Sequence, residues 1–283
     1  MTGTLLLAAV LTVRPAAPSA GQGGLVALTV ASDAPLTDLV LVDGERRVPL
    51  ERDVTGRVFH GLWGVDLDAK PGARALVLES GDGTVHRVVH ARVRKGAFPV
   101  QKLSVDPKFV EVPPEEVERV KADAERVNAA YRSADATRRW SSFARPLAAE
   151  GRNFGARRVY NGKTRSEHSG LDLAAPEGTP VTAAADGRVA LAGDLYFSGG
   201  TVLLDHGGVL FTQYMHLSRI DVKDGDVVAK GAVLGAVGKT GRATGPHLHW
   251  GARVDGARVN PEVLLTLPAW PVPAGPGETP GLH

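Results

Sequence analysis

Residues 11–95 consist of short apolar segments divided by turn residues. Each segment is only a few residues long, and turns such as Asp43-Gly44 and Gly81-Asp82-Gly83 separate them. Short strands at this spacing are typical of a small antiparallel sandwich. We therefore predict an immunoglobulin-like β-sandwich over residues 11–95, serving as an accessory module that carries no catalytic motif. The clearest predicted strands are Leu25–Val30, Leu39–Val42, Ala75–Glu79 and His86–Val93.

A helical pattern follows the predicted sandwich. Pro113-Pro114-Glu115-Glu116 supplies the prolines and acidic residues that favour a helix N-terminus. Apolar residues then recur at spacings of three and four, which places them on one helix face. We predict a helix over residues 114–131 within a linker that spans residues 96–139, with its apolar face used for packing. The apolar positions are Val117, Val120, Ala124, Val127 and Tyr131.

Residues 140–267 return to a strand pattern. Thr201–Leu204 and Val209–His216 flank Gly207-Gly208, which predicts a hairpin. Strands do not alternate with helices here, so a parallel α/β sheet is excluded and a mainly β, antiparallel domain is predicted. The Pro/Gly-rich residues 268–283 are expected to be a loosely packed tail. Further strands are predicted at Val227-Val228, Val233–Val237 and His249–Val254.

The first residues of the chain allow two interpretations. Leu5–Leu11 is an apolar run that is too short to span a bilayer. Residues 1–10 could be the remnant of a secretory signal with a cleavage region at Ala8 and Ala9, although no basic residue precedes the run. Alternatively, the run continues into a first strand that reaches Val13.

Composition narrows the possible functions. The 283 residues are 43% hydrophobic and 23% charged, which is typical of a globular protein. The formal net charge is only +2, and lysines and arginines form no concentrated stripe, so we expect no nucleic-acid partner. The absence of cysteine excludes thiolate zinc ligands and cysteine nucleophiles.

The first motif that could carry chemistry joins a histidine and an aspartate. His168 and Asp172 are four residues apart in a Gly-containing segment that does not favour a helix. On a straight strand their Cα atoms would be about 13 Å apart, which is too far to share a metal ion. A bend near Gly170 would bring the two side chains together, and a flexible residue such as glycine permits that bend.

The second motif is a pair of histidines. His247 and His249 are alternate residues of a predicted strand, so both point to one face about 6.6 Å apart along the chain, while Leu248 points into the core. Together with the first motif they form the nitrogen and oxygen ligand set that zinc accepts. A catalytic zinc site uses three protein ligands and keeps one position open, so one histidine of the pair should be free. Spacing does not indicate which one.

These motifs belong to a longer run of similarity. The stretch from about residue 143 to 266 resembles the catalytic domain of the LytM/lysostaphin-type zinc metallopeptidases, which cut peptides of peptidoglycan. The segments occur in the family's order and approximate spacing, whereas residues 1–95 resemble only loosely the β-domains that precede such catalytic domains. The matching segments are Phe154–Arg158, His168–Asp172, Pro180–Val189, Tyr214–Leu217 and Thr240–His249.

The resemblance assigns roles to five residues. It implies that His168, Asp172 and His249 bind one Zn²⁺ ion per chain. It also implies that His216 and His247 are catalytic histidines beside the metal, which agrees with the expectation of one free histidine in the pair.

Weaker candidates surround these five. Tyr160 and Asn161 occupy positions where the family often has groove-lining residues, so we expect both to contact substrate, Tyr160 as a possible oxyanion donor. Arg157 and Arg158 could meet substrate carboxylates or belong to a solvated loop. His206 lies at the predicted hairpin turn and is expected to be structural or at the surface.

The predicted function is that of a zinc metalloendopeptidase acting on peptidoglycan. The Arg158–Asn161 segment looks more like the enzymes that cut D-alanyl–diamino acid cross-links than those that cut glycine bridges. The alternative is a cell-wall-binding, non-catalytic activator of amidases, but such proteins typically lack a motif residue, and here all five are present. We expect an exported monomer in the periplasm, cell envelope or outside the cell, with peptidoglycan as its partner and no membrane span.

Overall fold

The computed structural model describes residues 9–132, 137–151 and 153–270. The chain divides into two compact units, whose described parts are residues 9–96 and 97–270. The predicted signal remnant falls almost entirely outside the described residues, as does most of the predicted tail. None of the described helices has the length and apolar character needed to cross a bilayer.

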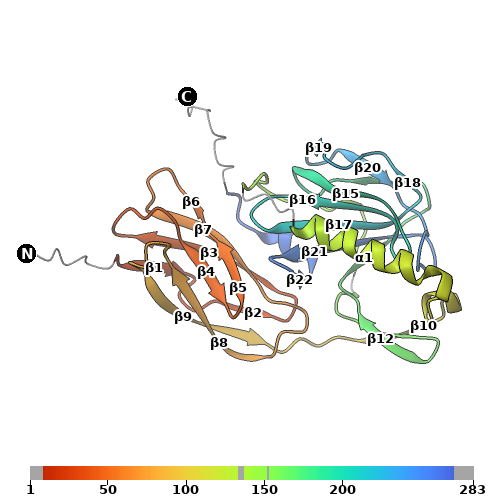
Figure 1. The fold of residues 1–283 in the computed structure, drawn as a ribbon, viewed down its shortest axis with the longest axis horizontal. Helices are drawn as coiled ribbons and strands as arrows, with labels where there is room; N and C mark the ends of the chain where they lie inside the picture. Colours follow the sequence, from red (N-terminus) through yellow and green to blue (C-terminus); the bar gives the residue numbers. More distant parts are fainter. Residues whose placement is uncertain (1–8, 133–136, 152, 271–283) are drawn as a thin grey trace, which may run out of the picture. The chain divides into compact units, whose positions relative to one another are not determined.

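The first unit consists of two β-sheets. Its strands alternate buried and exposed residues, as on β9, where Val89, Ala91 and Val93 are buried. The strands predicted from the sequence are all present (Figure 1). One sheet has the order β1 (Leu11–Arg14), β3 (Leu25–Ser32), β7 (Val58–Gly64) and β6 (Glu51–Arg52). The other has the order β2 (Ser19–Gly21), β9 (His86–Arg94), β8 (Gly72–Glu79), β4 (Val40–Asp43) and β5 (Arg46–Pro49).

A seven-stranded antiparallel sheet forms the centre of the second unit. Side chains such as Leu248 and Trp250 on β21 are fully buried on one face of this sheet. The residues between them, including His249, therefore point to the opposite face. The order is β13 (Gly170–Ala174), β21 (His247–Val254), β17 (Leu210–Leu217), β16 (Gly199–Asp205), β15 (Gly187–Leu195) and β19 (Val227–Val228), and β22 (Ala257–Val259) pairs with β21.

Two three-stranded sheets and three short 3₁₀ helices complete the second unit. In the first small sheet β10 runs parallel to β11, and a hairpin joins β11 to β12. This sheet consists of β10 (Val100–Leu103), β11 (Arg157–Tyr160) and β12 (Lys163–Glu167). The other consists of β14 (Pro180–Thr182), β20 (Val233–Ala236) and β18 (Arg219–Ile220). The 3₁₀ helices are η1 (Pro107–Phe109), η2 (Pro114–Glu116) and η3 (Pro261–Thr266).

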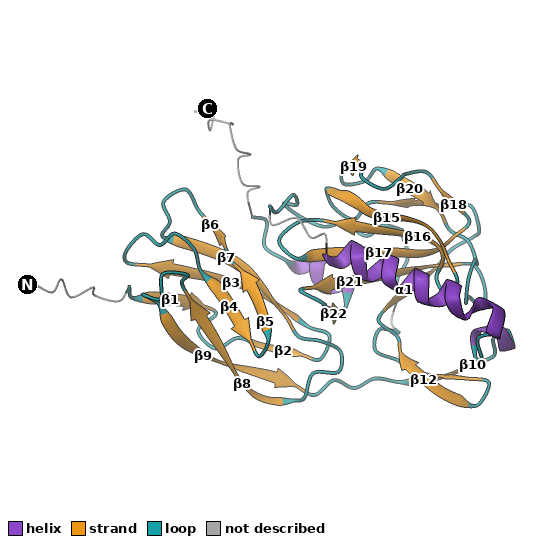
Figure 2. Ribbon diagram, viewed as in Figure 1, coloured by secondary structure: helices purple, strands orange, loops and turns teal. Residues whose placement is uncertain are grey.

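Helix α1 (Val117–Arg132) follows η2 and packs on the seven-stranded sheet (Figure 2). Ala130 is buried, and Val127 and Tyr131 flank it on the face that touches the sheet. The helix was predicted within a linker, whereas the structure groups residues 97–270 as one unit. An amphipathic helix must bury its apolar face, and this sheet provides the surface. The sheet residues of this cluster are Leu191, Leu195, Leu203 and Phe211.

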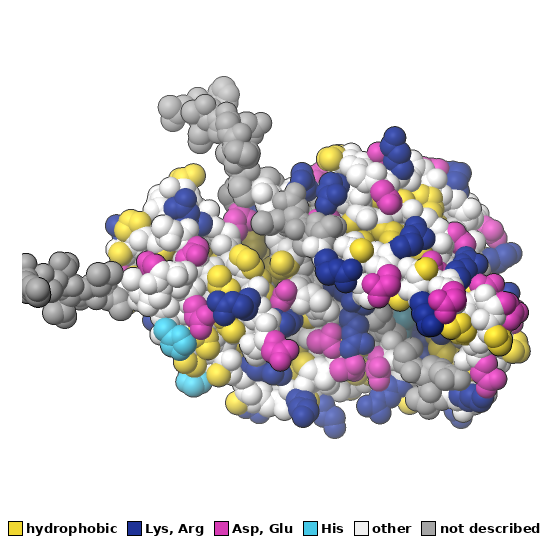
Figure 3. All heavy atoms as spheres, in the orientation of Figure 1, with side chains coloured by type: hydrophobic (Ala, Val, Ile, Leu, Met, Phe, Trp, Pro, Cys, Tyr) yellow, Lys and Arg dark blue, Asp and Glu magenta, His cyan; other side chains and the backbone are white. Residues whose placement is uncertain are grey.

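The surface carries both signs of charge. Basic and acidic side chains are interspersed over the face drawn in Figure 3. Many of them form short-range ion pairs, such as Arg219 with Asp221 and Lys121 with Glu118.

Candidate metal centre

Three side chains predicted as metal ligands converge at the edge of the seven-stranded sheet. Asp172 on β13 lies directly opposite His249 on β21, so both side chains occupy the same face. His168 precedes β13 and is anchored by backbone hydrogen bonds with Ala156 and Gly155. Its Nε2 atom lies 2.8 Å from Nδ1 of His249 and 2.9 Å from Oδ1 of Asp172. The ligand atoms of all three lie within 4.8 Å of one another.

Gly170 makes this convergence possible for a reason that differs from the sequence prediction. A Cβ atom at position 170 would lie 2.6 Å from Nε2 of His249 and 2.6 Å from the carbonyl oxygen of Trp250. The bend near Gly170 was expected to require a flexible backbone. The structure shows instead that the position must lack a side chain, because the imidazole of His249 occupies that space.

Neighbouring groups orient the ligands. Nδ1 of His168 donates to the carbonyl oxygen of Asn153 at 2.9 Å, which leaves a lone pair on Nε2. Oδ2 of Asp172 accepts hydrogen bonds from Asn153 (2.9 Å) and Arg158, so Oδ1 faces the two histidines. The sequence had offered Arg158 either for substrate carboxylates or for a solvated loop. Its observed partner is Asp172, and Asn153 was not singled out although it directly precedes the matching Phe154 segment.

The chemistry of this donor set fits a metal cation. Burial lowers the pKa of His168 to about 4, so its imidazole is neutral near pH 7. The single ring proton of His168 lies on Nδ1, which donates it to Asn153. Nε2 of His168 and Oδ1 of Asp172 are therefore both acceptors, and they face each other. Such an arrangement needs a cation between the two atoms. Two imidazole nitrogens and one carboxylate are ligands that zinc accepts, so these residues can hold a zinc ion.

His216 reaches the site through a β-bulge. Gly200 pairs with Leu217 and Val202 pairs with Tyr214, so Thr201 on β16 lies opposite two residues of β17. His216 is one of these two and has a φ of 66°, a strained left-handed conformation for a non-glycine residue. The sequence predicted a regular strand through His216. The bulge turns the side chain toward the site.

The two histidines predicted as catalytic share a common arrangement. Nδ1 of His216 lies 2.9 Å from the carbonyl oxygen of Thr240, and Nδ1 of His247 lies 2.8 Å from that of Gly245. Their ring centroids are 4.8 Å apart. Burial, with the charges of His249 and His247, lowers the pKa of His216 to about 3, so it is neutral near pH 7. Donation through Nδ1 leaves Nε2 of each ring able to accept a proton.

The two predicted substrate contacts have different surroundings. Tyr160 is buried at the end of β11, where its hydroxyl accepts a 3.4 Å hydrogen bond from Arg158 and its ring lies 4.8 Å below the guanidinium of Arg242. Asn161 lies in the turn after β11, and its amide exchanges hydrogen bonds of 2.9 and 3.1 Å with the backbone of Val105. The structure therefore brings Tyr160 to the site, whereas the side chain of Asn161 holds the backbone of a neighbouring loop at Val105.

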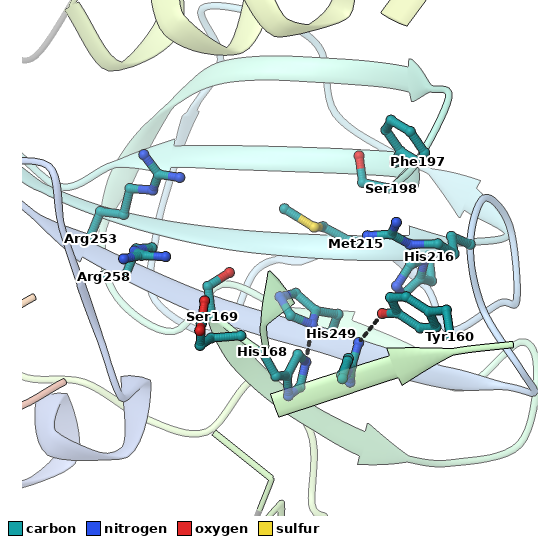
Figure 4. A pocket seen from close by; sticks show the side chains of 13 residues that line it. Tyr160, His168, Ser169, Phe197, Ser198, Met215, His216, His249, Arg253 and Arg258 are labelled. Carbon is teal, nitrogen blue, oxygen red and sulfur yellow. Dashed lines mark hydrogen bonds between the residues drawn. The ribbon is translucent and has the colours of Figure 1, made fainter. Parts of the chain in front are cut away.

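A groove of about 360 Å³ passes over these residues (Figure 4). His168 and His249 lie in its middle, and His216 and Tyr160 lie toward one end. His206, expected to be structural or at the surface, is fully buried, and its ring nitrogens lie 2.7 Å from the carbonyl oxygen of Asp186 and from the hydroxyl of Thr212.

Comparisons with known proteins point to one family. Residues 166–261 match the family model of peptidase family M23. A crystal structure from Pseudomonas aeruginosa described as an M23 peptidase is 31% identical, with a TM-score of 0.66. The alignment covers 86% of this chain and 94% of that one.

Curated relatives match over the same region. The chain is 48% identical over 101 residues to DD-carboxypeptidase/endopeptidase Mpg of Neisseria meningitidis, which is 36% of this chain and 23% of that protein. It is 43% identical over 109 residues to peptidoglycan DD-endopeptidase ShyA of Vibrio cholerae, which is 38% of this chain and 25% of that protein. The matches thus span about a quarter of the length of these relatives.

Proposed function

Because the chain belongs to peptidase family M23, we propose that it is a zinc metalloendopeptidase that hydrolyses peptide bonds in bacterial peptidoglycan. The observation that carries the proposal is the placement of two histidines, each held through Nδ1 by a backbone carbonyl, beside a three-ligand metal site. His168, Asp172 and His249 would hold one zinc ion. When bound, the zinc ion acts as a Lewis acid and lowers the pKa of water.

The protein side chains supply the proton transfers. One of His216 and His247 accepts a proton from the attacking water through Nε2, and the other protonates the departing amine. Both rings are held through Nδ1 by backbone carbonyls, which supports these roles because neither ring needs to turn. The hydroxyl of Tyr160, at the end of the same groove, would donate to the oxyanion that forms on the peptide carbonyl.

The bond favoured as substrate is the cross-link between D-alanine and a diamino acid. Relatives at 43% and 48% identity are named peptidoglycan DD-endopeptidase and DD-carboxypeptidase/endopeptidase, which supports this bond over a glycine bridge. A peptidoglycan substrate implies an exported protein in the periplasm, cell envelope or outside the cell. We propose that the protein works there as a monomer.

The alternative proposal is a non-catalytic activator of amidases. Such a protein would still bind cell wall but would need no complete metal site. The presence of His168, Asp172 and His249 together with His216 and His247 favours the enzyme.

We propose that the first unit, residues 11–95, is an immunoglobulin-like sandwich that docks the enzyme on its polymer. Its two sheets of four and five strands support a sandwich. The docking role is favoured over inhibition because the one group of side chains able to hold a metal ion among the described residues lies in the second unit.

The deciding experiment is product analysis. The purified full chain, loaded with zinc, is incubated with muropeptides that carry either D-alanyl–diamino acid cross-links or glycine bridges, and products are identified by mass spectrometry. We expect cleavage of the first class at the D-alanyl bond and none by the matched variant His216→Ala. A zinc-loaded protein that cleaves neither class, but stimulates a cell-wall amidase, would establish the alternative.

A further inference from the structure

The charged residues of the groove are predominantly basic. Arg158 is committed to Asp172, and Arg242 stacks on the rings of Tyr160 and Phe197 at 4.8 and 4.9 Å. These two arginines therefore help to build the site. Two others lie at the end of the groove opposite Tyr160 (Figure 4). The charged lining residues are Arg158, Glu167, Arg242, Arg253 and Arg258.

The register of one hairpin places the remaining two arginines face to face. Asp255 and Gly256 connect β21 to β22 and have φ values of 47° and 76°, the positive pair that a type I′ turn requires. This turn sets Arg253 directly opposite Arg258. Both side chains line the groove, so this end of the groove carries two neighbouring guanidinium groups.

The pair faces the same side of the sheet as the metal ligands. His249, Gly251 and Arg253 are alternate residues of β21 and point to one face. Gly251 has no side chain, so no side chain of β21 stands between His249 and Arg253 on this face. Arg253 lies four residues from His249, a separation of about 13 Å along the strand.

Arg253 is held in place yet is not neutralised. Its guanidinium lies 4.5 Å from the centre of the ring of Tyr131, which α1 contributes. Its Nε atom is buried and has no hydrogen-bond partner, and the ion pairs among the described residues do not include Arg253.

We propose that Arg253 and Arg258 bind a free carboxylate of the peptide substrate. This carboxylate would lie on the side of the scissile bond that faces the turn between β21 and β22, at Asp255. This inference rests on the proposed function and specifies its substrate class. Two adjacent guanidinium groups match the geometry of a carboxylate. A cross-link peptide that contains a dicarboxylic diamino acid or a γ-linked glutamate has a free carboxylate near the scissile bond. The interior of a glycine bridge has none, so the pair would select cross-link peptides.

The test compares two synthetic cross-linked peptides that differ only in having a free carboxylate or a carboxamide. With the zinc-loaded full chain, we expect kcat/KM to be about 10- to 100-fold higher for the carboxylate peptide, the usual effect of a charge-assisted hydrogen bond. Arg253→Gln and Arg258→Gln should each lower kcat/KM for the carboxylate peptide by a similar factor. For the carboxamide peptide the loss in kcat/KM should be much smaller, and the zinc content of both variants should match that of the wild type.

A surface arginine provides the matched control. Arg219 is exposed on β18 and is paired with Asp221, so Arg219→Gln should keep the full preference for the carboxylate peptide. If Arg253→Gln unfolds because it loses its contact with Tyr131, Arg258→Gln carries the test. Equal turnover of both peptides by the wild type, or equal losses on both peptides in the arginine variants, would overturn the proposal.

Calorimetric binding separates this inference from the proposed function. Both peptides are titrated into His216→Ala, with and without Arg253→Gln. A carboxylate preference that disappears with Arg253→Gln supports the site even if the wild type cleaves neither peptide, in which case only the enzyme proposal fails. Equal binding of the two peptides overturns the carboxylate site, whatever the outcome for catalysis.

Discussion

Asp172 and His249 face each other across the antiparallel pair β13–β21, with Oδ1 of the carboxylate 3.0 Å from Nδ1 of the imidazole. The register of two strands therefore assembles two of the three ligands. A slip of one residue would turn His249 to the buried face and leave Asp172 without its partner. The metal centre is thus as rigid as the sheet edge that carries it.

The first prediction concerns metal content. Wild-type protein should contain close to one zinc ion per chain by elemental analysis, and His168→Ala or Asp172→Ala should contain almost none. Asn153→Ala should weaken zinc binding by about 10- to 100-fold, because Asn153 only orients the ligands. Far-ultraviolet circular dichroism should be unchanged, while Tm falls because zinc binds only the folded state. A folded wild type without affinity for zinc would contradict the assignment.

The second prediction separates ligand from catalyst within the histidine pair. His249→Ala should lose zinc, whereas His247→Ala and His216→Ala should keep it. The latter two should lose about 10²- to 10⁴-fold in turnover, the usual effect of removing a general acid or base. Zinc analysis and a peptidase assay on the same preparations decide the matter. Loss of zinc from His247→Ala but not from His249→Ala would reverse the two roles.

The third prediction concerns the space at Gly170. Gly170→Ala should weaken zinc binding and lower the free energy of unfolding by about 1–3 kcal/mol, because the new methyl group overlaps the imidazole of His249. Denaturant titration and zinc analysis measure the two effects. Gly21→Ala is the control, since its Cβ would approach no atom closer than 3.9 Å. Equal zinc affinity in Gly170→Ala and wild type would show that the imidazole can move aside.

The fourth prediction concerns stability at acidic pH. Burial lowers the pKa of His206 from 6.5 to about 4, so the folded protein holds this imidazole neutral. The resulting contribution to the free energy of unfolding is complete above pH 6.5 and is lost as the pH falls from 6.5 to 4. It amounts to about 3 kcal/mol. In zinc-saturated samples, His206→Gln should lose less stability than wild type between these pH values, since the other histidines contribute equally to both proteins.

The fifth prediction concerns the second unit. A fragment that starts at Ala97 should fold, whereas one that starts at Trp140 lacks α1 and exposes Leu203 and Phe211. The shorter fragment should therefore be less soluble and should unfold at a lower temperature. Docking by the first unit predicts that the longer fragment matches the full chain on soluble peptides but is weaker on intact sacculi. Equal solubility of the two fragments would support the boundary that the sequence predicted at residue 140.

The common face of His247 and His249 was predictable because it depends on local periodicity. Alternation placed His247 and His249 on one face and Leu248 on the other, and the observed strand has this arrangement. The contacts of Asn153 and Arg158 with Asp172 were not predictable, since they depend on how a loop and a neighbouring hairpin fold over the sheet.

Two further features needed tertiary information. The apolar stripe predicted α1 but could not identify its packing partner, because many surfaces can cover such a stripe. The left-handed conformation of His216 depends on β17 having one residue more than β16 between paired positions. This additional residue can be recognised only when the register between β16 and β17 is known.

That additional residue changes how much chemistry one strand can present. In a regular strand, neighbouring side chains point to opposite faces. At the bulge, Met215 and His216 are consecutive, yet both line the groove. The central strand thereby presents two side chains where regular alternation would present one. The bulge places an additional imidazole in the groove without an added loop or strand. It interrupts the pairing of β16 with β17 at one position.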